Sequence, residues 1–276
     1  MCFIQRERII IPMRRYLVIG AGGIGSHLVE PLGRMLEYSD TEPTAIVIVD
    51  GDTYEEKNRS RQSFKDIGNK AEILAAELSE LFEETIIVGL NKWVVSDTSE
   101  VVTEDGENAS NKITAGDLLN ENDVVYAVVD NFMARHIILE AARFFQNIDV
   151  FLGGNDEDMF GSVYHYRRVN GQDITQNPND FKPEFQNPTD RNPGELSCQE
   201  RAEIDGGTQL IVANFGVAAT LLARTQATII EESDPIEILS VSEIFFDLRE
   251  GLMNNYDRRV KNTQLSNNKT LVENKG

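Results

Sequence analysis

The residues best suited to chemistry lie in four short groups within the first half of the chain. The first group is a glycine cluster in which Gly20, Gly22 and Gly25 fit the pattern G-x-G-x-x-G, between an apolar run and a helical pattern. Glycines permit a tight turn and let backbone N–H groups approach a phosphate at the positive end of a helix. The cluster therefore predicts a nucleotide-binding turn, and the alternative of a glycine turn without a ligand fits this context less well.

The second group begins at Asp50, directly after the apolar run at residues 45–49. A carboxylate at the end of a strand next to the glycine turn can accept hydrogen bonds from both ribose hydroxyls. The glycine cluster and Asp50 together indicate a nucleotide, but NAD and ATP would both satisfy them.

The residues that follow Asp50 separate these two nucleotides. Asn58, Arg61 and Lys70 come next, with Lys70 just after Gly68. A nicotinamide enzyme has no use for such groups beyond the ribose, whereas a triphosphate needs them. Arginine offers a planar fork of donors, and lysine offers a mobile positive charge. An alternative for Lys70 is a solvated helix residue.

The fourth group is centred on Asp130, which follows the apolar run at residues 124–129. Ligands gather at the carboxyl ends of parallel strands, and Mg²⁺ takes one or two carboxylates together with phosphate oxygens. Asp130 or Asn131 could instead cap the following helix. We assign the metal to Asp130, the cap to Asn131 and a structural role to Arg135.

These groups, taken in order, resemble the signature of the ThiF/MoeB and ubiquitin-activating-enzyme family of adenylyltransferases. The matching segments are residues 20–26, 50–62, 68–70 and 130–135, and the resemblance covers roughly residues 14–155. It implies that Asp50 holds the ribose, that Asn58, Arg61 and Lys70 contact the phosphates, and that Asp130 binds Mg²⁺. The rest of the implied ATP site consists of Gly20, Gly22, Gly23, Gly25, Ser26 and Asp52. Asp52 and Gln62 are expected to support the direct ligands.

The resemblance implies a reaction in which a carboxylate attacks the α-phosphate of ATP and gives an acyl-adenylate and pyrophosphate. The implied acceptor is the C-terminus of a small ubiquitin-like or peptide partner, and the implied assembly is a homodimer. In some relatives the partner's N-terminus supplies an arginine, and Arg6, Arg8, Arg14 and Arg15 are candidates here. The alternatives are a tRNA-modifying relative, an NAD-dependent Rossmann oxidoreductase, and a non-catalytic family member that binds a nucleotide or a partner.

Cys198 is a candidate nucleophile in a proline-rich stretch that takes the place of the family's crossover loop. The resemblance implies that a cysteine in this region can accept the acyl group as a thioester. However, Glu195, Glu200 and Glu203 would raise the pKa of the thiol, and no histidine lies near it in sequence. Nucleophile and bystander both remain open. Cys2 is the only other cysteine, so a four-thiolate zinc site is excluded and a reducing cytoplasm is expected.

Strands that alternate with helices must position these groups. Continuous apolar runs predict strands covered on both faces at residues 16–20, 45–49, 124–129 and 150–152, with a further strand at 86–88 or 93–95. Helical patterns follow the glycine cluster, Gly68 and Asn131. This alternation predicts an α/β fold with a doubly wound, Rossmann-like, mostly parallel sheet.

The second half of the chain is expected to complete the same domain. We divide the chain into an adenylation domain (1–169), a crossover loop or lid (170–206), a C-terminal helix with antiparallel strands (207–250) and a polar tail (251–276). Residues 97–112 are predicted as a loop, 210–230 as a long buried helix and 236–248 as one or two strands.

Composition limits the partners. The net charge of −20 repels phosphate backbones, which disfavours DNA, RNA and anionic membranes as the main partner. There is no apolar run of about eighteen residues, as a membrane-spanning helix needs. Glu7 and Pro12 interrupt the N-terminal arginines, so we expect no signal peptide.

Overall fold

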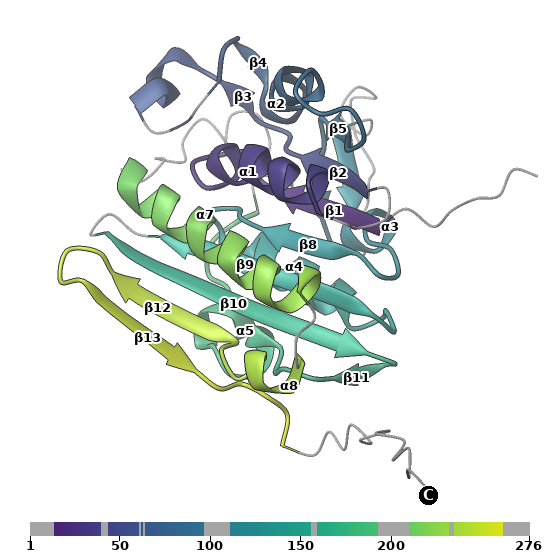
Figure 1. The fold of residues 1–276 in the computed structure, drawn as a ribbon, viewed down its shortest axis with the longest axis vertical. Coiled ribbons are helices and arrows are strands. Elements are labelled where there is room, and N and C mark those ends of the chain that lie inside the picture. The colour runs from purple at the N-terminus through teal and green to yellow at the C-terminus, as the bar shows by residue number, and fades with distance from the viewer. Residues whose placement is uncertain are drawn as a thin grey trace, which may run out of the picture.

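A nine-stranded sheet forms the centre of the molecule (Figure 1). The computed structural model describes residues 14–39, 44–60, 62, 64–96, 111–155, 159–192, 210–231 and 235–261. The strand order is β13-β12-β10-β9-β8-β1-β2-β5, and β11 pairs with β10. The strands of this sheet are β1 (Arg14–Ile19), β2 (Thr44–Val49), β5 (Ile86–Leu90), β8 (Val124–Ala127), β9 (Ile148–Asn155), β10 (Phe160–Val169), β11 (Gln172–Asp173), β12 (Glu243–Asp247) and β13 (Leu252–Tyr256).

The sheet has a parallel part and an antiparallel part. Strands β5, β2, β1, β8 and β9 run parallel to their neighbours, and β10, β12 and β13 continue the sheet antiparallel. This arrangement confirms the predicted doubly wound, mostly parallel sheet with antiparallel strands from the C-terminal region.

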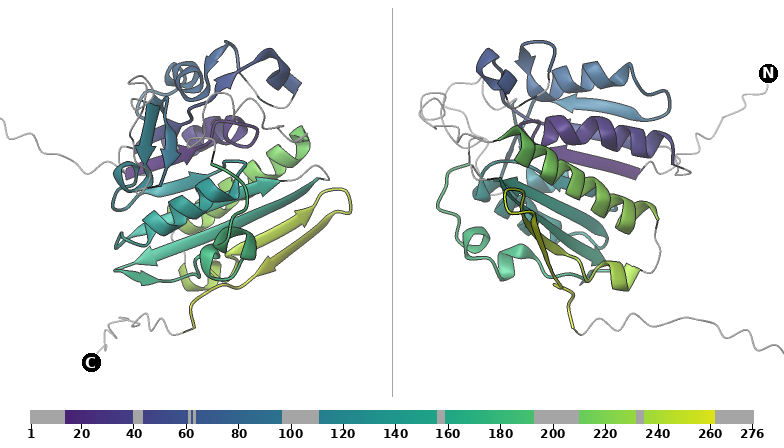
Figure 2. Two further views of the ribbon diagram at one scale, coloured as in Figure 1. Left: turned by 180° about the vertical axis from the view of Figure 1, so that it is seen from behind. Right: turned by 60° about the vertical axis from the view of Figure 1, so that its left-hand side comes forward.

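Helices cover both faces of the sheet (Figure 2). The face that carries Tyr16 and Val18 packs against α1 (Gly25–Glu37), α2 (Lys70–Ser79) and α7 (Ile211–Thr225). The face that carries Leu17 and Ile19 packs against α3 (Ala115–Leu118), α4 (Phe132–Ala142) and α5 (Pro183–Gln186). Successive side chains of one strand thus enter two separate apolar cores, which is why the central strands are continuously apolar.

Side-chain caps start the two helices that follow the predicted ligands Lys70 and Asp130. Asn131 Oδ1 accepts from the backbone N–H of Ala134 at 2.7 Å, as predicted for the cap of α4. Asn69 Oδ1 accepts from the backbone N–H of Glu72 at 3.0 Å at the start of α2. These bonds satisfy N–H groups that have no partner within the helix.

The region after β5 differs from its prediction. Both alternatives for the strand exist, since β5 joins the main sheet and β6 (Trp93–Val95) pairs in parallel with β7 (Lys112–Thr114) in a small separate sheet. The predicted loop is therefore wrong at residue 112, while 97–110 lie outside the described residues. Strand β7 forms by pairing with β6, which is distant in sequence, so the local composition around residue 112 does not predict a strand.

The predicted lid is folded in the part that is described. Residues 172–186 contain β11, the short helix η3 (Pro178–Asp180) and α5. Two asparagines bind this segment to α4, because Asn177 Nδ2 donates to Leu139 O at 3.1 Å and Asn179 Nδ2 donates to His136 O at 3.2 Å. Residues 193–206, which include Cys198, lie outside the described residues.

The C-terminal prediction needs three corrections. Residues 235–238 form the short helix α8 (Pro235–Ile238), so the strand begins only at Glu243. The region predicted as a polar tail starts with β13. All five residues of this strand are exposed, so its sequence does not show the alternation of apolar and polar residues that indicates a half-buried strand. The predicted buried helix α7, continued by the π turn η5 (Gln226–Ile230), leaves Ile211, Val212 and Phe215 between 40% and 51% exposed.

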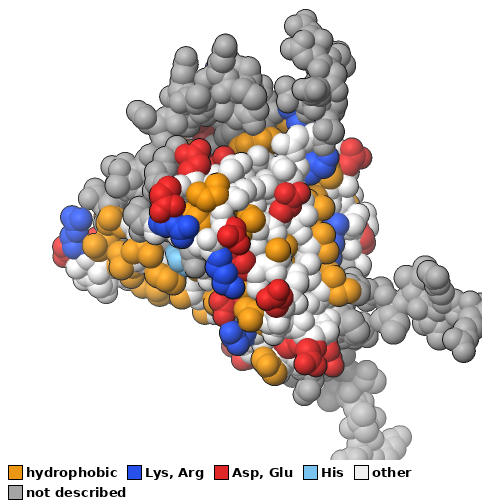
Figure 3. Space-filling view, turned by 90° about the horizontal axis from the view of Figure 1, so that it is seen from above, with side chains coloured by type: hydrophobic (Ala, Val, Ile, Leu, Met, Phe, Trp, Pro, Cys, Tyr) orange, Lys and Arg blue, Asp and Glu red, His pale blue; other side chains and the backbone are white. Residues whose placement is uncertain are grey.

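The surface has apolar as well as charged regions. Figure 3 shows apolar side chains gathered over one part of the face seen from above, with acidic and basic side chains mixed over the remainder. Within the described part of the chain, no helix combines the length and the apolar character needed to cross a bilayer.

Candidate active site

The glycine turn between β1 and α1 is held closely against neighbouring backbone. Gly20 has a φ of 101°, in the region that favours glycine, and a Cβ there would lie 2.9 Å from Val128 O. A Cβ on Gly25 would lie 2.0 Å from Gly20 O. Gly22 differs, because it lines the cavity and a Cβ there would meet only Gln62 Nε2, at 3.8 Å.

The predicted ligands of this turn thus separate into two groups. Gly20, Gly22 and Gly23 line the cavity, whereas Gly25 and Ser26 lie beneath it. Ser26 is buried, and its Oγ lies 3.4 Å from Gly23 O. In this structure Gly25 and Ser26 therefore shape the turn and do not line the cavity.

Asp50 joins the end of β2 to the glycine turn. Its Oδ2 accepts from the backbone N–H of Ala21 at 2.7 Å, and its Oδ1 accepts from the backbone N–H of Asp52 at 2.8 Å. Burial holds the pKa of the Asp50 carboxyl above its ordinary value, although the charge of Lys70 acts in the opposite direction. Tyr54 supports the same turn, because its hydroxyl donates to Ala21 O at 2.9 Å.

Lys70 reaches this site through a short hairpin. Strand β3 (Thr53–Tyr54) pairs with β4 (Gly68–Asn69), and this pairing places the start of α2 beside Asp52. Lys70 Nζ lies 2.5 Å from Asp52 Oδ2, and the residue is only 7% exposed. The interpretation of Lys70 as a solvated helix residue is therefore wrong.

The electrostatic surroundings of Lys70 come from three carboxylates. Burial alone lowers the pKa of Lys70, but the charges of Asp50, Asp52 and Asp130 outweigh that effect and hold the pKa above its ordinary value. The ammonium is therefore positively charged at neutral pH, and it is a cation available to a phosphate at this place.

The segment after β3 supplies two further polar side chains. Asn58, in the short helix η1 (Glu56–Ser60), is 5% exposed, and its Oδ1 accepts from the backbone N–H of Glu55 at 2.9 Å. Gln62 is 8% exposed and lines the cavity, and its Oε1 has no hydrogen-bond partner among the described residues. Arg61 lies outside the described residues.

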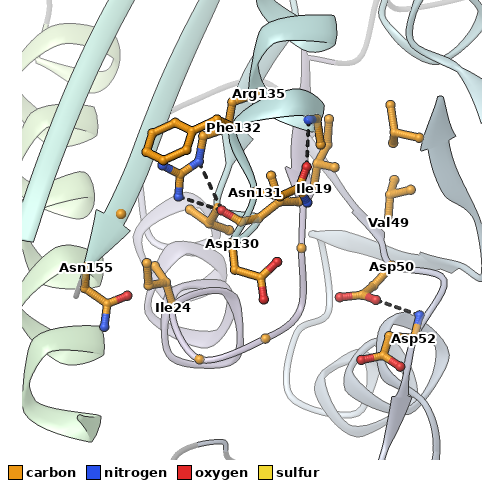
Figure 4. A pocket seen from close by; sticks show the side chains of 18 of the residues that line it. Ile19, Ile24, Val49, Asp50, Asp52, Asp130, Asn131, Phe132, Arg135 and Asn155 are labelled. Atoms are coloured by element: carbon orange, nitrogen blue, oxygen red, sulfur yellow. Dashed lines mark hydrogen bonds between the residues drawn. The ribbon is translucent and has the colours of Figure 1, made fainter. Parts of the chain in front are cut away.

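Asp130 projects into the cavity between the glycine turn and Asp50 (Figure 4). Arg135 anchors the turn that carries it, because Arg135 Nη2 donates to Val129 O at 2.6 Å and to Gly153 O at 3.0 Å. These bonds support the predicted structural role of Arg135. Among the described residues, no three His, Cys, Asp or Glu side chains form a metal site. Mg²⁺ bound by Asp130 would therefore need phosphate oxygens as further ligands, which fits the chemistry of that ion.

One cavity of about 1070 Å³ connects these residues to a second group that sequence reasoning missed. The missed lining residues come from β6, β9, β10, β12, α4 and the segment around α5: they are Trp93, Phe132, Asn155, Phe160, Ser162, Tyr164, Glu184, Phe185, Asn192 and Phe245. Apart from Phe132, which stands at a variable position of the segment 130–135, none of them lies in a matched motif. Only the strand order, which brings β10 and β12 next to β9, could have identified them.

Two residues that sequence reasoning missed, the lining residue Asn155 and the nearby Asp190, affect the site directly. Both amide atoms of Asn155 are buried without a hydrogen-bond partner among the described residues, and the side chain lies at the edge of the cavity (Figure 4). Asp190 lies on the segment after α5, and its carboxylate accepts from the backbone N–H groups of Phe132 and Met133 at 2.5 and 3.0 Å. The predicted lid thus holds the first turn of α4 in place, directly after Asp130.

Solved structures of other proteins share this architecture. Escherichia coli MccB with ATP is 16% identical, with a TM-score of 0.58, over 91% of this chain and 65% of that chain. E. coli MccB with MccA-N7isoASN is 16% identical, with a TM-score of 0.61, over 91% and 66%. The microcin C7 biosynthetic enzyme MccB with N-formylated MccA is 15% identical, with a TM-score of 0.59, over 91% and 66%.

These likenesses show the fold. The chain spans about two thirds of the length of the MccB chains that it matches, 65% for the complex with ATP. None of the curated proteins compared with this sequence matches it.

The family comparison covers most of the chain. The ThiF family profile matches residues 10–230, a range that includes the glycine turn, Asp50, Lys70, Asp130 and α7. Its extent agrees with the ordered motifs and with the cavity that they line, and the chain belongs to the ThiF family.

Proposed function

We propose that this protein uses ATP and Mg²⁺ to adenylate the C-terminal carboxylate of a peptide or a small ubiquitin-like protein. The observation that carries the proposal is the buried Lys70 ammonium, which lies among Asp50, Asp52 and Asp130 beside an open glycine turn. A triphosphate provides the negative charge that this cation and a metal on Asp130 would bind together.

In the proposed reaction, an oxygen of the acceptor carboxylate attacks the α-phosphorus of ATP. A new bond forms between that oxygen and phosphorus, and the bond from the α-phosphorus to the oxygen that leaves with the β-phosphate breaks. Pyrophosphate carries away the electron pair. No proton transfer is required, so the protein contributes positioning and charge stabilisation.

The residues have distinct roles in this proposal. Asp50 already accepts two backbone N–H groups, but each carboxylate oxygen has a second lone pair for a ribose hydroxyl. Lys70 exchanges its contact with Asp52 for the phosphates. Asn58 and Arg61 complete the phosphate contacts, and a magnesium ion on Asp130, when bound, neutralises phosphate charge.

An oxidoreductase that uses NAD would explain the glycine turn and Asp50. It would leave the buried Lys70 and the inward-facing Asp130 without a role in the reaction. A non-catalytic family member that binds a nucleotide or a partner is the remaining alternative.

The test is ATP–pyrophosphate exchange with Mg²⁺. We expect exchange only with an acceptor that has a free C-terminal carboxylate, and none with the same peptide amidated at its C-terminus. ATP binding without exchange for every acceptor would favour the non-catalytic alternative. NADH binding seen by fluorescence would favour the oxidoreductase.

A matched pair of lysine variants tests the carrying observation. Lys70→Met should lower the exchange rate by roughly 10²–10³, as removal of a single stabilising donor does elsewhere. Lys65→Met changes an exposed lysine and should leave the rate unchanged. Equal rates for the two variants would contradict the role of Lys70.

A thioester on Cys198 is a possible second step of the proposed reaction. The thiolate would attack the acyl carbon, and AMP would leave with the electron pair of the broken carbon–oxygen bond. A Cys198→Ala variant should keep exchange and lose any reducible adduct with the acceptor. An adduct that persists in this variant would exclude Cys198 as the nucleophile.

A further inference from the structure

Four aromatic rings form one wall of the cavity, and we call this wall the aromatic lobe. It consists of Phe132, Tyr164, Phe185 and Phe245. The ring of Phe185 makes edge contacts with Phe132 at 5.3 Å and with Tyr164 at 5.4 Å, and Tyr164 contacts Phe245 at 5.8 Å between centroids. The rings thus pack on one another as a continuous surface. Phe185 and Tyr164 are almost fully buried within it, and the half-buried rings of Phe132 and Phe245 present more of their surface to the cavity.

Apart from Phe132, which lies next to Asp130, the aromatic lobe lies away from the place predicted for the ribose. In the strand order, Asp50 follows β2, Asp130 follows β8, and Tyr164 and Phe245 lie on β10 and β12. At a strand spacing of about 4.8 Å, β2 and β8 are about 10 Å apart, and β2 and β12 are about 24 Å apart. A nucleotide with its ribose at Asp50 and its phosphates at Asp130 fills the first of these spans and leaves the lobe free.

The cations around the lobe are already paired, so they do not favour an anionic occupant. Arg135 lies 5.5 Å from the Phe132 ring, but its donors already bind the carbonyls of Val129 and Gly153. Lys182 lies 4.6 Å from the Phe245 ring and is paired with the buried Glu243 at 2.6 Å. Glu184, which also lines the cavity, adds a negative charge at this side.

On the basis of the proposed adenylation, we propose that the acceptor ends in a residue with a bulky apolar side chain. That side chain occupies the aromatic lobe while the terminal carboxylate lies at the nucleotide near Asp130. The lobe begins beside this point, because Phe132 lies on the same turn as Asp130 (Figure 4). A tail that ends in two glycines would leave the half-buried rings of Phe132 and Phe245 in contact with water.

The experiment uses synthetic seven-residue peptides that differ only in the last residue, which is Gly, Asn, Leu or Phe. ATP–pyrophosphate exchange should give a kcat/KM about 10²-fold higher for Phe or Leu than for Gly, as expected when an apolar pocket loses an apolar group. Equal values, or a preference for Gly or Asn, would overturn the inference and leave the proposed function intact.

Direct binding separates the two proposals. If no peptide supports exchange, calorimetry with the same peptides and a non-hydrolysable ATP analogue decides the inference by itself. Tighter binding of the Phe-ended peptide would keep the aromatic lobe as its site while the adenylation fails. Binding without preference, or no binding of the Phe-ended peptide, would overturn the inference.

A variant that fills the lobe tests its location. Ser162 lines the cavity and lies opposite Phe245 across the strand pair, so Ser162→Phe should remove the preference for Phe-ended peptides and retain ATP binding. Ser79→Phe on the exposed end of α2 is the matched control and should change neither. Loss of ATP binding in Ser162→Phe alone would place the nucleotide in the lobe and overturn the inference.

A milder change serves if Ser162→Phe does not fold. Phe245→Leu shortens one ring of the lobe and should reduce the Phe-to-Gly ratio of kcat/KM several-fold. Phe144→Leu makes the same change at a residue that is 83% exposed and should leave the ratio as it is. An unchanged ratio in Phe245→Leu would also contradict the inference.

Discussion

The two sides of the cavity carry different kinds of side chains. The side near β2 and α2 carries charges that already have protein partners, such as Asp50 with two backbone N–H groups and Lys70 with Asp52. The side near β10 and β12 presents the aromatic lobe. Charged groups that are held in place before a substrate arrives need little reorganisation. Apolar surface stabilises a complex when binding removes it from water.

This difference predicts which substitutions should alter the reaction of every acceptor and which should alter the reaction of only some acceptors. A change on the charged side should alter the rate whatever acceptor is bound. A change in the aromatic lobe should alter the choice of acceptor. The segment around Asp190 touches both sides and should affect both properties.

The largest expected effect belongs to Asp130. Asp130→Asn removes the carboxylate that projects between the glycine turn and Asp50, and exchange should fall roughly 10²–10³-fold for every acceptor. The measurement is ATP–pyrophosphate exchange across a range of Mg²⁺ concentrations. The exposed Asp66→Asn is the control and should keep the full rate. A loss confined to one acceptor would break the comparison between the two sides.

A smaller effect is expected at Asp190, which caps the first turn of α4. Asp190→Ala should lower the free energy of unfolding by about 1 kcal/mol, as loss of a helix cap does. Because Phe132 lies on this turn and Asp130 comes shortly before it, the rate of exchange should also fall. The Phe-to-Gly ratio of kcat/KM should decrease as well. Urea unfolding and the peptide series measure these effects.

The control for Asp190 is Asp180, which forms an exposed pair with Arg143 at 2.7 Å. Asp180→Ala should change the free energy of unfolding by less than about 1 kcal/mol, because exposed ion pairs contribute little. If Asp190→Ala behaved in the same way, the lid segment would not hold the site in place.

The smallest effect is expected at Glu37, outside both sides of the cavity. Its carboxylate accepts from the backbone N–H groups of Glu83, Glu84 and Thr85, and hydrogen bonds from Thr85 and Glu83 lower its pKa to about 2. Glu37→Gln should lower the Tm by about 1–2 °C near pH 7 and leave exchange unchanged.

The pH dependence of this effect has a definite sign. A carboxyl whose pKa is depressed by folding contributes stability above its unfolded value of about 4.5, and that contribution disappears as the pH falls toward about 2. Thermal unfolding from pH 7 to pH 3 should therefore show the two Tm values converging below about pH 4.5. A difference that widened on acidification would contradict the assignment.

The predictable parts of the fold are those with strong local patterns. The apolar runs of β1, β2, β8 and β9 specified buried strands, because each face of these strands enters a core. Strand β13 was not predicted, because its residues are all exposed and it forms by pairing with β12. Strand β7 likewise depends on a partner seventeen or more residues away in sequence, β6.

The site shows the same division. Asp50, Lys70 and Asp130 were recognised from residue type and spacing, and all three line one cavity. Gly25 and Ser26 were assigned to the nucleotide, yet they lie under the turn, because the space above Gly25 is filled by Gly20 O. Arg61 and Cys198 lie outside the described residues, and their roles stay predictions.

By itself, the amino-acid sequence determined the doubly wound fold and the charged side of the cavity. Short-range features encode both, namely apolar runs, a glycine turn and polar residues directly after strands. Only the tertiary structure decided that Lys70 is buried beside Asp52 and that rings from α4, α5, β10 and β12 form the opposite wall. That wall depends on antiparallel pairing and on packing between segments up to about eighty residues apart in sequence, which no local pattern records.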